Sequence, residues 1–143
     1  MNTSSITPDA ARVRAQLLIW WLVWSGVLLG LVIIFLVLGR APVKAPPAGA
    51  NPLTGLVGLV PLFVSIIIRW LVLPRFTDLS RAFPLFIVGL GLAEACGLLG
   101  IFLGGAAYRD DLFLLGVLGI TQYVPFFARQ YLVPKTTGFI PNN

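Results

Sequence analysis

The sequence predicts an all-α membrane protein in which four transmembrane helices form an antiparallel bundle. Three observations indicate this fold class: 58% of the 143 residues are hydrophobic, only 10% are charged, and the mean hydropathy is +0.96. A soluble globular domain carries about 25% charged residues. Apolar runs near the roughly 20 residues needed to cross a bilayer recur along the chain. We therefore expect residues 1–143 to form one transmembrane domain.

The four predicted spans cover residues 17–38, 53–73, 83–107 and 112–132. The first follows Arg12 and Arg14, as the apolar part of a secretory signal would. It is longer than the roughly 7 to 15 residues of such a segment, so we expect a retained helix. The second span begins after the proline-rich segment 41–52, which we expect to be an extended connector.

A tight turn over residues 75–81 precedes the third span, and Asp78 or Ser80 in this turn can cap the helix. Pro84 then falls near the first helical turn, where its missing N–H costs little. The fourth span is the most polar of the four, so we expect other helices to surround it. Its polar residues are Thr121, Gln122, Tyr123 and Arg129.

Two pairs of short segments repeat along the chain. RWLVLPR at 69–75 matches RQYLVPK at 129–135, and GVLLG at 26–30 matches CGLLG at 96–100. Such matches are typical of two duplicated hairpins. The alternative is that helix ends on the cytoplasmic side independently gather Arg, an aromatic residue and Pro, because the positive-inside rule and helix termination favour these types.

Basic residues are distributed unevenly between the two ends of the predicted spans. One side receives seven, which are Arg12, Arg14, Arg69, Arg75, Arg81, Arg129 and Lys135. The other side receives three, which are Arg40, Lys44 and Arg109, beside Asp110 and Asp111. By the positive-inside rule we expect a multi-pass protein of the cell membrane with both termini in the cytoplasm.

The chain contains no histidine and a single cysteine, Cys96. Imidazole is the usual ligand of haem and catalytic zinc and the commonest general base near neutral pH. We therefore expect no metal site, no cofactor and no enzymatic activity. The net charge of +5 comes from basic residues at span ends, so we expect no nucleic-acid partner. The expected partners are the lipid bilayer and other membrane subunits, or further copies of the chain.

One carboxylate, Glu94, lies inside the apolar segment GLAEACGLLG, and no other charge occurs between Arg81 and Arg109. It lies about eleven residues, or about 16 Å, into the third span. This depth is near the bilayer midplane. An ionised residue there costs about 2.5 to 3.5 kcal/mol. We therefore expect Glu94 to be a neutral carboxylic acid.

Small residues recur every three or four positions around Glu94 and predict a groove for close helix packing. The fourth span offers Gln122 and Tyr123 at a similar depth, as hydrogen-bond partners or as members of an ion-binding site. Glu94 is then either an interhelical hydrogen-bonding group, worth about 1 kcal/mol, or a proton or cation site. We favour the first, because no second ionisable residue continues a relay toward either surface. The groove residues are Gly89, Ala93, Gly97, Gly100 and Gly104.

The segment GLGLAEACGLLGIFLG, residues 89–104, resembles the carboxylate-bearing helix of the c-subunit proteolipids of rotary ATP synthases. The resemblance implies that Glu94 is an ion-carrying carboxylate. It also implies that the second and third spans form its hairpin, with Arg75 in the basic loop. The second span departs from that family, because it has only Gly55 and Gly58 where c-subunits have a run of alternating glycines.

The short loops and the groove of small residues favour a helix-packing or accessory component of a membrane assembly, without catalytic activity. The alternative function is proton or cation binding and translocation through Glu94. A membrane enzyme is the least favoured class. The only adjacent carboxylates, Asp110 and Asp111, are expected in a solvated loop between the third and fourth spans.

Overall fold

The computed structural model describes residues 8–39, 52–76 and 79–126, and the regular elements in these ranges are all helical. This confirms the all-α fold. The elements are α1 (Pro8–Ile34), η1 (Phe35–Gly39), α2 (Pro52–Ile67), η2 (Ile68–Val72), η3 (Leu73–Arg75), α3 (Leu79–Leu103) and α4 (Gly105–Thr121). The segments η1 and η2 are π-helical turns that extend α1 and α2.

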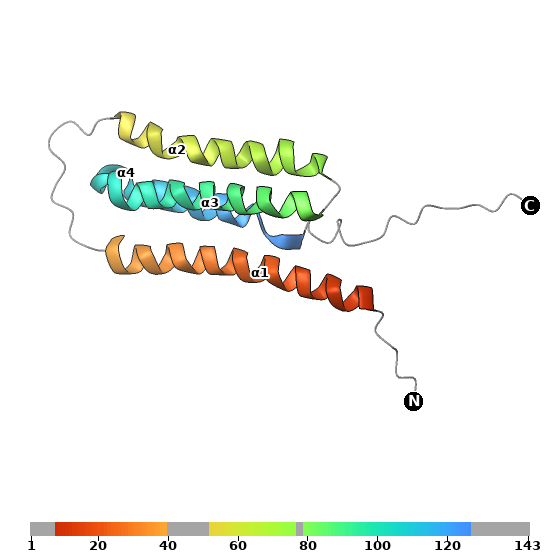
Figure 1. Cartoon of the computed structure of the whole chain (residues 1–143). Helices are drawn as coiled ribbons and strands as arrows, with labels where there is room; N and C mark the ends of the chain where they lie inside the picture. The colour runs from red at the N-terminus through yellow and green to blue at the C-terminus, as the bar shows by residue number, and fades with distance from the viewer. Residues whose placement is uncertain (1–7, 40–51, 77–78, 127–143) are drawn as a thin grey trace, which may run out of the picture.

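The helices α3 and α4 lie side by side, with α2 on one side of this pair and α1 on the opposite side (Figure 1). Successive helices alternate in direction, which gives the predicted antiparallel bundle. Within the described ranges, α1 makes its helix contacts with α3 and α4 and does not pack along α2. The first two helices therefore do not form a closed hairpin like α3 and α4. Residues 129–135 of the sequence repeat lie outside the described residues.

Within the described residues, three helical stretches are long and apolar enough to cross a membrane, as expected for a membrane protein. They are Arg14–Gly39 with 26 residues, Gly55–Arg75 with 21 and Arg81–Leu103 with 23. The fourth helix, α4, has 17 residues, or about 26 Å. Other predicted features fall outside the described residues: the end of the fourth span at 127–132, the connector 41–51, a cap by Asp78, and the basic residues Arg40, Lys44, Arg129 and Lys135.

The third and fourth helices meet at a two-glycine turn, earlier than the sequence suggested. α3 ends at Leu103 and α4 begins at Gly105, which has a φ of +57°. Only glycine adopts this left-handed conformation without steric cost. The chain therefore reverses here and not at the charged residues. Asp110 and Asp111, expected in a loop, lie in α4, and the Arg109 Nε donates to Asp110 Oδ1 at 3.0 Å.

The end of α4 also has a local cause. Pro125 has no N–H group to donate to the carbonyl of Thr121, as the next turn of a helix would require. Val124 N donates to this Thr121 oxygen instead, at 3.1 Å, and the chain leaves the α-helical path. The carbonyl groups of the last turn of α4 are thereby left to accept hydrogen bonds from side chains of other helices.

The first helix is held to the bundle by few contacts. Trp24 Nε1 donates to the Ile120 carbonyl at 2.9 Å, and the Phe35 ring stacks on Phe113 with centroids 3.8 Å apart. Trp20 packs against Phe86 with ring centroids 4.5 Å apart and is only 2% exposed. In the most apolar stretch of each helix, 11% of the residues of α1 are buried, compared with 22% for α2 and 39% for α3. α1 is therefore the most peripheral of the three candidate spans.

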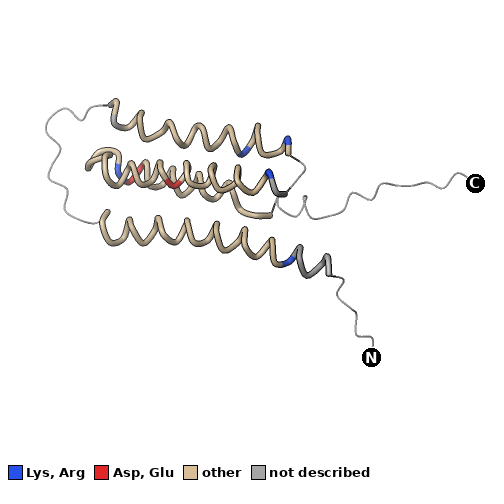
Figure 2. The backbone as a smooth tube through the Cα atoms, in the orientation of Figure 1, with Lys and Arg blue, Asp and Glu red and all other residues tan. Residues whose placement is uncertain are grey.

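Charged residues lie mainly at the two ends of the bundle. The end where α1 begins carries Arg14, Arg69, Arg75 and Arg81, and the opposite end carries Arg109, Asp110 and Asp111 (Figure 2). The long apolar section between these ends contains Glu94. This arrangement separates the half-buried carboxyl group of Glu94 from the charged ends of the molecule.

Candidate functional site

Glu94 lies in the middle of α3, about 20 Å along the helix from Arg81 and about 14 Å from Leu103. Its side chain is half-buried. No hydrogen bond or ion pair joins its carboxyl group to any residue in the described parts of the chain. In the apolar section of a membrane helix, lipid tails supply no hydrogen-bond partner for such a group.

The position of Glu94 on α3 follows from the contacts of its neighbours. Phe86 of α3 packs on Trp20 of α1, and Leu31 of α1 occupies the space beside Gly97. Residues three or four apart share a helix face, so Glu94 belongs to the row that faces α1. It is turned by about 100° from Ala93, which touches α4. Glu94 therefore lies at the outer edge of the contact between α1 and α3.

Tyr123 lies elsewhere, in a buried polar cluster between α2, α3 and α4. Its hydroxyl donates to the Ser65 carbonyl at 2.6 Å, and Ser65 Oγ donates to the Gly89 carbonyl at 2.7 Å. The same Ser65 Oγ lies 3.3 Å from the Tyr123 hydroxyl oxygen. Both side chains are fully buried, at 0% exposure. The polar groups of Tyr123 and Ser65 thus satisfy one another and the backbone without Glu94.

Gln122 is held at the basic end of α2. Trp70 Nε1 donates to Gln122 Oε1 at 3.1 Å, and Arg69 Nε donates to the Gln122 carbonyl at 2.8 Å. The Arg69 guanidinium also lies over the Trp70 ring, 5.3 Å from its centroid. The structure therefore does not bring Glu94, Gln122 and Tyr123 together. Tyr123 has its partner on α2, and Gln122 has its partners in η2. The side-chain Nε2 of Gln122 is buried without a hydrogen-bond partner among the described residues.

The predicted small residues of α3 lie where other helices of the chain approach it closely. A Cβ placed on Gly116 of α4 would lie 2.7 Å from the Gly97 nitrogen and 3.2 Å from the Ala93 carbonyl oxygen. A Cβ on Gly100 would lie 3.0 Å from the Arg109 carbonyl oxygen. The backbones of α3 and α4 can reach this separation only because these positions have no larger side chains.

The other predicted small residues serve different contacts. A Cβ on Gly89 would collide with the Tyr123 hydroxyl, so this glycine makes room for the buried cluster. At Gly104 the closest atom would be the Gly100 carbonyl oxygen, 2.6 Å away in the turn between the helices. Gly116 and Gly119 of α4 were not among the predicted packing residues, although their spacing of three residues indicates a matching small face on α4.

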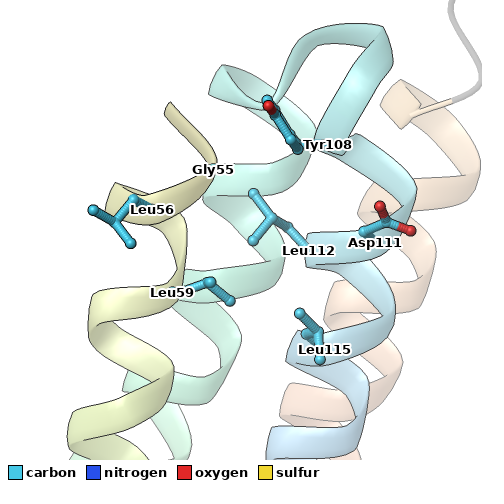
Figure 3. Close-up of a pocket in the computed structure, with 7 residues that line it drawn as sticks. All are labelled: Gly55, Leu56, Leu59, Tyr108, Asp111, Leu112 and Leu115. Atoms are coloured by element: carbon cyan, nitrogen blue, oxygen red, sulfur yellow. The ribbon is translucent and has the colours of Figure 1, made fainter. Parts of the chain in front are cut away.

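An open apolar cleft of about 390 Å³ lies between α2 and α4 at the end of the bundle where α4 begins. Figure 3 shows leucine side chains from both helices around it, whereas the Asp111 carboxylate points away from α2. Its lining offers no converging polar groups to orient a substrate. The lining residues are Gly55, Leu56, Leu59, Tyr108, Asp111, Leu112 and Leu115.

Among the described residues, no three His, Cys, Asp or Glu side chains group together as metal ligands. Cys96 is buried, and its sulfur lies 3.7 Å from the Leu112 carbonyl oxygen in the helix interface. The site that the structure presents is therefore a single carboxyl group, Glu94, at the edge of the seam between α1 and α3.

No family model, no curated protein and no solved structure matches the chain. The resemblance to c-subunit proteolipids is thus confined to the short segment 89–104.

Proposed function

We propose that this chain is a non-catalytic component of a membrane assembly, in which the outer edge of the α1–α3 seam binds another transmembrane helix. The observation that supports this function is the carboxyl group of Glu94, in the middle of an apolar helix, which has no partner in the described part of the chain. A neutral carboxylic acid has one O–H group that donates a hydrogen bond and oxygen atoms that accept hydrogen bonds, and both need partners. Within lipid, only another protein segment or trapped water supplies these partners.

The packing inside the bundle supports the same proposal. α3 and α4 already fill the groove of small residues, as at Gly97 and Gly116. The polar groups of Ser65 and Tyr123 are likewise satisfied within the chain. Glu94 is different, because its half-buried side chain lies at the outer edge of the α1–α3 seam and its carboxyl group has no partner among the described residues. We infer that the hydrogen-bonding partner of Glu94 belongs to another protein molecule in the membrane.

Native mass spectrometry in mild detergent tests this function. We expect species heavier than the 15.5 kDa chain alone. Glu94→Leu, which removes both donor and acceptor, should shift these species toward the monomer by about threefold to tenfold, since an interhelical hydrogen bond is worth about 0.6 to 1.4 kcal/mol. Glu94→Gln retains a donor and an acceptor and should preserve the assembly.

Thr121→Val provides the matched control. Thr121 is an exposed polar residue of α4 whose hydroxyl bonds the Leu118 carbonyl of its own helix at 2.8 Å. Its removal should leave the assembly unchanged. A strictly monomeric wild-type chain at all protein concentrations would refute the proposed function.

A second candidate function is proton or cation binding by Glu94. The outward, unpartnered position of the carboxyl group favours it, because a carboxyl group sealed against Gln122 or Tyr123 could not exchange an ion. For this function we expect labelling of Glu94 by a hydrophobic carbodiimide, and loss of labelling and ion flux in Glu94→Gln. Asp111→Asn, at an exposed position, is the control. Ion flux that persists in Glu94→Gln would reject this candidate.

We also propose that the end of the bundle bearing Arg14, Arg69, Arg75 and Arg81 faces the cytoplasm, with both termini on that side. The greater number of basic residues at this end supports the orientation through the positive-inside rule. Labelling of a cysteine at position 75 from outside intact cells would contradict it.

A further inference from the structure

Three glycines in the described part of the chain have open space where a side chain would lie, unlike the glycines in the helix interfaces. A Cβ placed on Gly26, Gly30 or Gly91 would meet no atom within 4 Å. At Gly97 and Gly116, in contrast, the same atom would collide with a neighbouring helix. The open glycines therefore create space on the surface that the described residues do not fill.

The open glycines lie on the same side of the molecule as Glu94. α1 and α3 run in the same direction (Figure 1), and α4 covers one flank of their seam through Trp24 and Phe35 of α1. Gly30 is turned by about 120° from Trp24 and by about 140° from Phe35, so it lies on the flank away from α4. Glu94 lies on this flank of α3, as its rotation away from the α4-facing residues shows.

These residues also lie at similar depths along the bundle. Trp20 packs beside Phe83 and Phe86, and Leu31 packs beside Gly97, so α1 and α3 are in register with an offset of about 66 residues. Glu94 is therefore level with a point between Gly26 and Gly30. One face of the molecule thus combines an unpartnered carboxyl group with a small, unfilled surface on the adjacent helix.

We propose that this face binds a second copy of the chain, in a two-fold symmetric dimer whose two Glu94 side chains pair with each other. The inference rests on the proposed function and names its partner. A neutral carboxylic acid donates through its O–H and accepts through its carbonyl oxygen. Two such groups related by a two-fold axis satisfy each other completely, with each O–H bonded to the carbonyl oxygen of its mate.

Self-association fits the geometry of this face. A two-fold axis along the membrane normal keeps both copies in the same orientation and places the two Glu94 residues at the same depth. Gly26 and Gly30 are four residues apart on the exposed side of α1, the spacing that allows two parallel helices to approach closely in lipid. The flanking Leu29 and Ile33 are 60% and 49% exposed and supply the surrounding apolar contact.

Disulfide cross-linking of the full chain in lipid vesicles tests the dimer. Cys96→Ala removes the native thiol, and Gly30→Cys then places one thiol on the proposed interface, where an added Cβ is free of contacts. Near a two-fold axis, the same residue of both copies meets its mate. We therefore expect oxidation of Gly30→Cys to give a covalent dimer.

Val57→Cys in the same background is the matched control. Val57 is 55% exposed on α2, on the other side of the bundle, and should give little cross-linking. Adding Glu94→Leu to Gly30→Cys should reduce the dimer by about threefold to tenfold. Adding Glu94→Gln should preserve it, because two amide side chains can also pair reciprocally.

The outcomes separate this inference from the proposed function. Equal cross-linking of Val57→Cys and Gly30→Cys, or a dimer unaffected by Glu94→Leu, would overturn the inference. Heavier species in native mass spectra without cross-linking of Gly30→Cys would also overturn it, while leaving the proposed function intact. Monomers alone in both experiments would refute both.

Discussion

Gly116→Ala is expected to destabilise the bundle by about 2 kcal/mol. The added Cβ would lie 2.7 Å from the nitrogen and 2.8 Å from the Cα of Gly97. These are backbone atoms of α3, so no side chain can rotate away to relieve the contact, and α3 and α4 must separate. The free energy of unfolding is measured by titration with SDS in mixed micelles. Unfolding is followed by the fluorescence of the buried Trp20 and of Trp24.

Gly91→Ala is the control for this substitution. Gly91 lies on the same α3 helix, and an added Cβ meets nothing within 4 Å. In a detergent that keeps the chain monomeric, this variant should be as stable as the wild type or gain up to about 1 kcal/mol from helix propensity. Equal destabilisation by both substitutions would mean that close packing of α3 on α4 is not the cause.

Gly89→Ala is expected to cost about 2 to 3 kcal/mol, because it combines overpacking with a disrupted hydrogen bond. The added Cβ would collide with the Tyr123 hydroxyl, which is held in place by its 2.6 Å bond to the Ser65 carbonyl. Tyr123 is fully buried and has no free space into which to move. The same SDS unfolding measurement gives the loss in free energy.

The double variant Gly89→Ala with Tyr123→Phe distinguishes this mechanism from a general helix effect. Tyr123→Phe alone should cost about 1 kcal/mol through the lost hydrogen bond. In the double variant the nearest colliding atom, the hydroxyl oxygen, is absent, although the ring carbon Cζ would still lie 2.5 Å from the added Cβ. The clash is therefore reduced, and the total cost should be smaller than the sum of the single costs. Additivity within about 0.5 kcal/mol would contradict a direct clash at this site.

The sequence predicts the fold class well because membrane helices are recognisable from length and hydropathy alone. The candidate spans at Arg14–Gly39, Gly55–Arg75 and Arg81–Leu103 correspond to the first three predicted spans. The small residues of α3 were also apparent from their spacing, and the structure places Ala93, Gly97 and Gly100 against α4. Periodicity identifies the packing face of a single helix, so these features require no knowledge of the other helices.

Features that depend on which helices are neighbours could not be predicted in this way. Depth alone suggested that Glu94 would meet Gln122 or Tyr123, but depth does not specify the direction around a helix. Tyr123 pairs with Ser65 on a different side of α3. Similarly, nothing in the sequence shows that Trp20 is buried against Phe86 of α3, because an aromatic residue near a helix end can face either lipid or a neighbouring helix.

The two-glycine turn between α3 and α4 also bears on how the chain enters a membrane. Because only Gly104 separates the two helices, we expect them to enter the bilayer together as a single helical hairpin. The hydrophobic surface of α3 then carries the shorter α4 with it. α4 therefore does not have to be long enough to insert into the bilayer without α3.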